Sequence, residues 1–228
     1  MTSAHDDSRP VSVLTIAGSD SGGGAGIQAD LKTFAAHGVH GLSALAALTA
    51  QHTRGVTAVH VPPTAFLEAQ IDACFDDFRI GAVKLGMLAS ADVIATVARA
   101  LARHRPRHVV VDPVMVATSG ARLLEADALD ALRTQLLPLA TVITPNLPEA
   151  ELLLGWAIGD AAAMSHAALA LRALGAPAVL LKGGHLAGPG EVVDILSHAD
   201  GGQRTAHPPL QLGAHGTGCT LAPPAAPH

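Results

Sequence analysis

The sequence predicts an α/β fold with three layers, in which helices cover both faces of a mostly parallel central sheet. Short apolar runs rich in β-branched residues recur along the chain, and segments with apolar residues at helical spacing separate them. Apolar residues make up 49% of the 228 residues and charged residues only 14%. This composition predicts one domain with a large packed core.

The first predicted unit is a strand over residues 11–17, a glycine-rich loop over residues 18–26 and a following helix. The loop does not match the dinucleotide-binding motif, because Ile27 stands where the third glycine is required, and no P-loop motif occurs. Strands are predicted over residues 42–48 and 56–61, with residues 51–55 as a polar connection between them. A helix from Thr64 to about Phe78 follows.

The rest of the chain repeats this alternation of strands and helices. Strands are predicted over residues 82–85, 108–111, 141–144 and 178–181. Ser90 is expected to cap one helix, another is expected around residues 128–137, and two more lie between the last two strands.

Polar residues and glycines come directly after five of the predicted strands. Parallel strands place such positions at one carboxyl-end edge, where open α/β sheets bind ligands. Each residue taken singly is also ordinary loop chemistry, but their coincidence predicts a site. The residues are Gly18, Asp20, Lys84, Met87, Asp112, Asn146, Glu149, Lys182 and Gly183.

The segment Gly216-Thr217-Gly218-Cys219 has the composition of an anion cradle. Two glycines around a threonine let successive backbone N–H groups point at one centre, and a following helix start would add its positive end. Cys219 would place a proton acceptor beside the bound charge, which favours phosphoryl transfer. A plain structural turn is the alternative for this segment.

Composition argues against several other classes of protein. The net charge is −5, tyrosine is absent and only one tryptophan occurs, which disfavours nucleic-acid binding. The most continuous apolar stretch, residues 39–50, is too short and too interrupted to span a membrane. The thirteen histidines form no metal-binding motif, and a buried thiol is expected at Cys74. The polar first ten residues carry no secretory signal, so a cytoplasmic location is expected.

Seven motifs, in order from about Val11 to Thr220, resemble those of the hydroxymethylpyrimidine/phosphomethylpyrimidine kinases of thiamine biosynthesis. Those kinases belong to the ribokinase-like superfamily, so the resemblance implies a ribokinase-like three-layer α/β/α fold. The motifs cover residues 15–33, 50–55, 84–88, 112–115, 143–150, 181–185 and 215–220.

The resemblance implies two successive ATP-dependent phosphorylations, of a pyrimidine's hydroxymethyl group and then of the monophosphate. Cys219 would be the base, and the amides of Gly216, Thr217 and Gly218 would hold the transferred phosphoryl group. The other matched positions divide into three groups. These are Asp112 and Glu149 for Mg²⁺, Lys182, Asn146 and Thr144 for the nucleotide, and Gln51, Gly18, Asp30, Met87 and Val114 for the pyrimidine. Ordinary core packing is the alternative for Met87 and Val114.

The C-terminal sequence departs from the family's pattern. Relatives continue after the cradle with long helices, whereas residues 221–228 here are rich in proline. The expected organisation is a disordered tail over residues 1–10, a kinase domain over 11–220 that lacks its C-terminal helices, and an irregular tail over 221–228. Two alternatives remain open: a pyridoxal kinase-like activity, or an inactive fragment that only binds ligand. Relatives are often dimers, so the resemblance also allows a homodimer.

Overall fold

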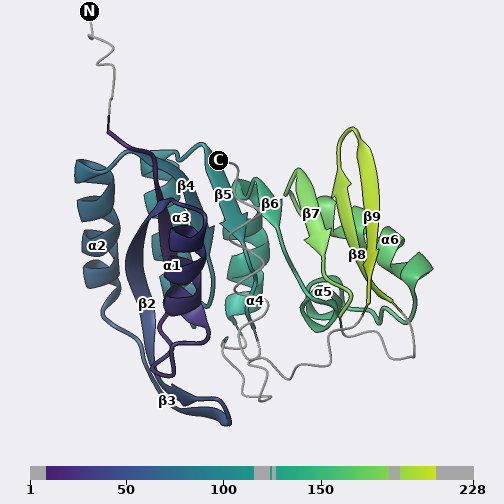
Figure 1. The fold of residues 1–228 in the computed structure, drawn as a ribbon, viewed down its shortest axis with the longest axis horizontal. Helices are drawn as coiled ribbons and strands as arrows, with labels where there is room; N and C mark the ends of the chain where they lie inside the picture. Colours follow the sequence, from purple (N-terminus) through teal and green to yellow (C-terminus); the bar gives the residue numbers. More distant parts are fainter. Residues whose placement is uncertain (1–8, 116–123, 125–126, 185–190, 209–228) are drawn as a thin grey trace, which may run out of the picture.

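The computed structural model describes residues 9–115, 124, 127–184 and 191–208, and a sheet of nine strands forms the centre of this part of the chain (Figure 1). The strands lie in the order β3-β2-β1-β4-β5-β6-β7-β8-β9. Their bounds are β1 Ser12–Gly18, β2 His40–His52, β3 Gly55–His60, β4 Ile80–Leu85, β5 His108–Val111, β6 Val142–Ile143, β7 Ala178–Leu181, β8 Val192–His198 and β9 Gly201–His207.

The middle of the sheet is parallel, as the alternating sequence pattern predicts. Strands β2, β1, β4, β5, β6 and β7 pair in parallel with their neighbours, while β3, β8 and β9 join the two ends in antiparallel pairing. The β8–β9 hairpin was not predicted. Strand β9 is polar and exposed along its whole length, so it has no apolar run that would mark it as a strand.

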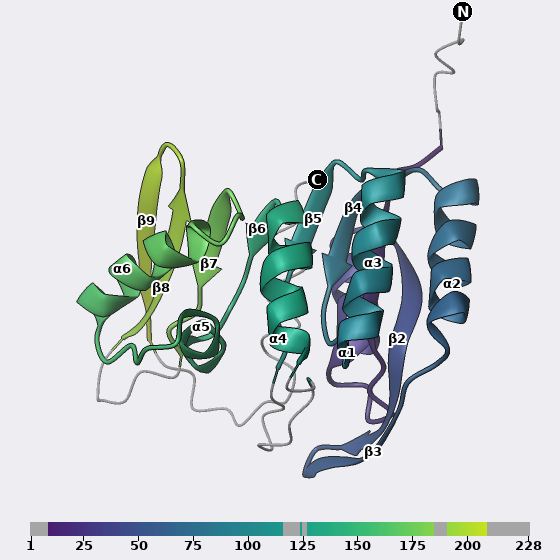
Figure 2. The same ribbon diagram turned by 180° about the vertical axis from the view of Figure 1, so that it is seen from behind.

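Helices cover the sheet on both faces, so the predicted three-layer α/β/α architecture is confirmed (Figures 1 and 2). Among the described helices, α1 lies on one face, and α2, α3, α4 and α6 lie on the other. The helix bounds are α1 Gly26–Ala36, α2 Thr64–Asp77, α3 Ala91–His104, α4 Ala128–Ala131, α5 Leu147–Leu154 and α6 Ala161–Arg172.

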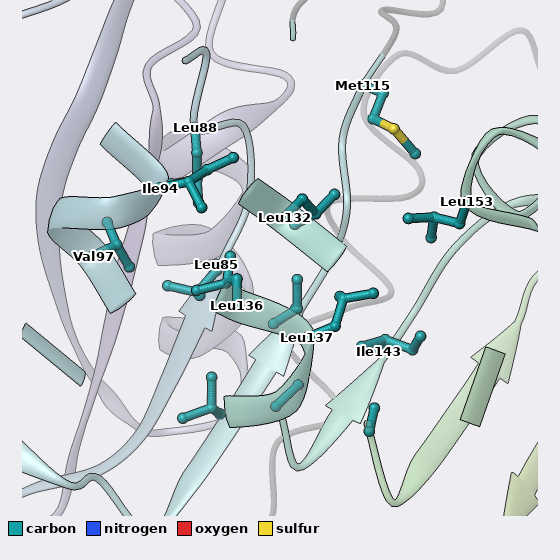
Figure 3. Packing of buried hydrophobic residues seen from close by; sticks show 14 of the residues in the cluster. Leu85, Leu88, Ile94, Val97, Met115, Leu132, Leu136, Leu137, Ile143 and Leu153 are labelled. Carbon is teal, nitrogen blue, oxygen red and sulfur yellow. The ribbon is translucent and has the colours of Figure 1, made fainter. Parts of the chain in front are cut away.

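The main hydrophobic core lies between the sheet and the larger helical layer. Helix α3 contributes Val93, Ile94, Val97 and Leu101, which recur at helical spacing and face the sheet. Ser90 caps this helix, as predicted, because its hydroxyl accepts a hydrogen bond from the Val93 amide. Figure 3 shows residues of this core packed together, among them Leu85, Leu88, Ile94, Val97, Leu132, Leu136, Leu137 and Ile143.

Three details of the predicted elements are wrong. Gln51 and His52, predicted as part of a polar connection, belong to β2. This strand extends past the end of β1 and forms an antiparallel hairpin with β3. The helix predicted over residues 128–137 changes to a π-helical turn at Leu132–Leu136 and then to a 3₁₀ turn at Leu137–Leu139, where Pro138 has no N–H to donate. Cys74 is only half-buried, because it lies at the margin of the core and not inside it.

Candidate active site

The loop after β1 is organised by the Asp20 carboxylate. Its two oxygens accept hydrogen bonds from the amides of Gly22, Gly24 and Ala25 at 2.8, 2.9 and 2.8 Å, and the Asp20 amide donates to Gln28 Oε1 at 2.8 Å. The Asp20 side chain is buried. The loop therefore has a defined shape at the carboxyl end of β1.

Two glycines let this loop pass close to the end of the strand. Gly26 has a φ of +55°, and a Cβ on it would lie 2.2 Å from the Gly18 carbonyl oxygen. A Cβ on Gly18 would in turn lie 3.0 Å from Met87 Sδ. A side chain at Gly26 would collide with fixed backbone, so glycine is required there for steric reasons.

A small apolar cluster adjoins Gly18. Ala47, Met87 and Ala89 are buried together, and the partly buried Val61 and Val114 pack against them. The Gly18 amide donates to the Met87 carbonyl at 3.1 Å, which joins the ends of β1 and β4. The structure thus brings Gly18, Met87 and Val114, which the family resemblance assigns to the pyrimidine site, into one region.

Gln51 lies near the end of β2, beside the glycine loop. Its backbone is fastened to Ser21: the Ser21 hydroxyl donates to the Gln51 carbonyl, and the Gln51 amide donates to the Ser21 hydroxyl oxygen, both at 2.7 Å. Gln51 Oε1 accepts from the Thr49 hydroxyl at 3.1 Å. These contacts place a partly buried carboxamide next to the loop.

Asp30, on helix α1, forms a fully buried ion pair with Lys84. Lys84 Nζ is 3.0 Å from each Asp30 carboxylate oxygen, and the Thr15 hydroxyl donates to one of them at 2.6 Å. Burial raises the pKa of the Asp30 carboxyl, while the Lys84 ammonium and the Thr15 hydroxyl oppose the rise. Neither Asp30 nor Lys84 has exposed side-chain surface, so the pair connects α1 to the sheet from inside the protein.

A second polar cluster lies at the ends of β5, β6 and β7. Asp112 Oδ1 accepts from Lys182 Nζ at 2.8 Å and from the Thr144 hydroxyl at 3.1 Å. All three residues are buried. Three residues from different parts of the sequence thus meet at the carboxyl edge of the sheet, where the strand positions predicted Asp112 and Lys182 to lie.

Glu149 and Asn146 form a capping box at the start of α5. The Asn146 side chain accepts from the Glu149 amide at 2.9 Å, and the Glu149 carboxylate accepts from the Asn146 amide at 2.8 Å. Burial and the nearby Asp112 charge raise the pKa of Glu149 to about 7, while Lys182 and Asn146 oppose the rise. Two carboxyl groups at such a site favour a bound cation, because a cation would remove the repulsion between them.

The cradle residues Gly216, Thr217, Gly218 and Cys219 lie outside the described residues.

Within the described residues, no group of three or more His, Cys, Asp or Glu side chains is arranged to hold a metal ion by itself. Among these same residues, no helix is both long enough and apolar enough to cross a membrane.

The family model for phosphomethylpyrimidine kinase matches residues 20–226, which include most of the glycine loop and the polar cluster. This chain belongs to the phosphomethylpyrimidine kinase family. The hydroxymethylpyrimidine/phosphomethylpyrimidine kinase of Rhizobium meliloti is 54% identical over 211 residues, covering 92% of this chain and 79% of that enzyme. A thiamine biosynthesis bifunctional protein of Geobacter sulfurreducens is also 54% identical, and this chain spans only 43% of its length.

Solved structures of this kinase family and of pyridoxal kinases share the fold. The phosphomethylpyrimidine kinase of Clostridium difficile superposes with a TM-score of 0.82 at 43% identity, covering 93% of this chain and 87% of that one. An ADP complex of Bacillus subtilis pyridoxal kinase gives a TM-score of 0.85 at 36% identity, with 95% and 82% covered. The ribokinase-like fold expected from the motifs is therefore confirmed.

Sequence reasoning missed two residues that contact the candidate site residues. Thr15 is inside β1 and reads as an ordinary strand residue, yet its hydroxyl contacts Asp30. Asp194 is in the unpredicted strand β8, and its carboxylate accepts from the Gly183 amide at 2.9 Å. A lone aspartate within an alternating apolar run was the only available signal for Asp194.

Proposed function

We propose that this chain transfers the γ-phosphoryl group of ATP to the hydroxymethyl group of 4-amino-5-hydroxymethyl-2-methylpyrimidine, and then phosphorylates the resulting monophosphate. The observation that carries the proposal is the arrangement of one sheet edge. A glycine-lined apolar region at the ends of β1 and β4 adjoins an acid–lysine cluster at the ends of β5, β6 and β7, in a chain of this kinase family. The kinase domain is proposed to comprise residues 11–220.

The pyrimidine is proposed to bind beside the glycine loop. Met87 and Val114 would contact the faces of the flat ring, and Gly18 would allow it to approach the backbone. The Gln51 carboxamide offers a donor and an acceptor together, which an aminopyrimidine edge requires. Asp30 would act on this pocket indirectly, because its buried ion pair with Lys84 fixes α1 against β4.

The nucleotide phosphates are proposed to bind at the polar cluster. Lys182 supplies the positive charge, while Asn146 and Thr144 supply an amide and a hydroxyl beside it. ADP occupies the Bacillus subtilis pyridoxal kinase structure, which shares this fold. The cluster therefore suits the polyphosphate of ATP.

Asp112 and Glu149 are the residues proposed to hold Mg²⁺, directly or through its waters. The fit rests on their chemistry: both carboxyl groups are buried, and the Asp112 charge helps to raise the pKa of Glu149. Bound Mg²⁺ would neutralise negative charge on the phosphate oxygens.

Cys219 is proposed to take the proton from the attacking hydroxyl group. The backbone amides of Gly216, Thr217 and Gly218 would donate to the transferred phosphoryl oxygens. This assignment rests on the resemblance of the segment to the family's pattern. We also propose that the reaction takes place in the cytoplasm and that a homodimer is the working form, as the family resemblance suggests.

ADP release by the purified 228-residue chain tests this function. With Mg-ATP and the pyrimidine alcohol, wild type should turn over, and Cys219→Ala should lose at least about 100-fold in kcat, the order of effect expected for a general base. A folded wild-type chain that binds ADP but releases none from ATP would contradict the catalytic proposal.

Pyridoxal phosphorylation is a second candidate, because a pyridoxal kinase at 36% identity superposes with a TM-score of 0.85. Pyridoxal also carries a hydroxymethyl group on a flat heterocycle. Comparing kcat/KM for the two alcohols decides between them, and a higher value for pyridoxal would make it the preferred substrate.

A further inference from the structure

The segment after β7 places Lys182 next to Asp112, and its backbone is held on both sides of Lys182. On one side, the Lys182 amide donates to the Pro145 carbonyl at 2.9 Å, and Lys182 forms a parallel bridge with Asn146. On the other side, the next amide, that of Gly183, donates to Asp194 Oδ1 at 2.9 Å. The first contact uses backbone atoms, whereas the second depends on one side chain.

Gly183 passes tightly against β8. A Cβ at this position would lie 1.9 Å from the Val193 carbonyl oxygen and 2.9 Å from Met164 Cε. The segment can therefore approach β8 only because residue 183 is glycine. This close approach brings the Gly183 amide within reach of the Asp194 carboxylate.

Asp194 also has a contact on the side away from Gly183. Its other carboxylate oxygen, Oδ2, lies 3.5 Å from His207 Nε2 on strand β9, and the Asp194 side chain is only 18% exposed. The Asp194 carboxylate thus links the segment after β7 to the β8–β9 hairpin. A hydrogen bond from an amide to a carboxylate is stronger than one to a neutral acceptor, which suits a contact that must hold a loop in place.

We infer that Asp194 is a positioning residue for nucleotide binding, acting through Gly183 to hold the backbone from which Lys182 reaches the phosphate site. This inference rests on the proposed function, since it takes Lys182 as a phosphate ligand. Among the described residues, Asp194 forms no hydrogen bond with Asp112 or Glu149; the partners of its side chain are Gly183 and His207. Its loss should therefore weaken ATP binding and leave the pyrimidine pocket, at the ends of β1 and β4, unaffected.

The test compares steady-state kinetics of Asp194→Ala, Asp194→Asn and Asp200→Ala in the full chain. Asp194→Ala should raise the KM for Mg-ATP about tenfold, the effect of losing one charge-assisted hydrogen bond, with the KM for the pyrimidine alcohol unchanged. Asp194→Asn keeps an oxygen that can accept from Gly183, so it should recover most of the loss. Asp200 is the matched control: it lies in the turn of the same hairpin, is 96% exposed and is also near a histidine, His198.

Direct ADP binding, measured by calorimetry without the pyrimidine, separates this inference from the proposed function. A wild type that binds ADP, with affinity reduced in Asp194→Ala and restored in Asp194→Asn, supports the inference even if turnover fails. Equal affinity in wild type and Asp194→Ala overturns it, as does an equal rise in both KM values or the same loss in Asp200→Ala. If Asp194→Ala does not fold, Asp194→Leu, which removes the acceptor for the Gly183 amide but fills a similar volume, decides through the same ratio of the two KM values.

Discussion

Lys182 Nζ lies 2.8 Å from Asp112 Oδ1, and this contact joins the ends of β7 and β5 across the intervening strand β6. The Thr144 hydroxyl, from the end of β6, donates to the same oxygen. Asp112 is thus held in one orientation by two donors from the next two strands. The pair lies at the site where the proposed function places the phosphates of ATP beside the Lys182 ammonium.

Lys182→Met should therefore damage both stability and activity. Removing one partner leaves the Asp112 carboxylate buried without its cation, which should cost about 3 kcal/mol of unfolding free energy. The KM for ATP should rise at least about tenfold as well. Urea unfolding and initial rates measure the two effects, and normal ATP kinetics in a folded Lys182→Met variant would remove Lys182 from the phosphate site.

Glu149 should make stability depend on pH. Its pKa is raised from 4.5 to about 7 in the folded state, so the folded protein binds a proton more tightly than the unfolded chain. The stability that this proton contributes is fully present below about pH 4.5 and is lost as pH rises through about 7. Glu149→Gln should remove this loss, on the order of 2 kcal/mol, and flatten the profile.

Unfolding free energies at pH 5 and pH 8 measure this effect. Glu151→Gln is the control, because Glu151 lies on the same helix, is only partly buried, and its replacement by Gln keeps the oxygen that accepts from the Ile158 amide. Added Mg²⁺ should stabilise wild type at pH 8 more than Glu149→Gln. An equal pH dependence in wild type and Glu149→Gln would show that Glu149 is not the group responsible.

The buried Asp30–Lys84 pair should behave as a unit. Asp30→Leu or Lys84→Met alone leaves one charge without its partner in the interior, and each should cost about 3 kcal/mol or more. The double variant leaves neither charge and should cost clearly less than the sum of the two. A double-mutant cycle by urea unfolding measures the coupling, and additive losses would show that the two side chains act independently.

The close approach at Gly26 predicts a steric effect on the loop. Gly26→Ala would place a Cβ 2.2 Å from the Gly18 carbonyl oxygen, so the glycine loop must move and pyrimidine binding should weaken about tenfold. Gly38→Ala is the matched control, since Gly38 also has a positive φ but no atom within 4 Å of its Cβ position. That variant should lose about 1 kcal/mol of stability without a change in KM.

The mostly parallel sheet and the edge that carries the candidate site followed from sequence alone. Alternating apolar runs and helical spacing predict a parallel sheet, and the residues after each strand then share one edge for geometric reasons. Thus Asp112 and Lys182 could be expected at the same edge, whereas the contact of Thr144 with Asp112 became visible only in the structure. The capping pair Asn146 and Glu149 is local in sequence and was also accessible to pattern reasoning.

Tertiary structure decided the contacts that link distant segments through buried groups. Asp30 and Lys84 are 54 residues apart, and only the packing of α1 on the sheet shows that they pair in the interior. Strand β9 has no apolar pattern and forms because β8 offers it a free edge to pair with. Asp194 likewise reaches Gly183 only because that glycine passes within contact distance of β8. Short-range patterns determine which elements form and which edge they share, whereas pairing between remote side chains depends on how those elements pack.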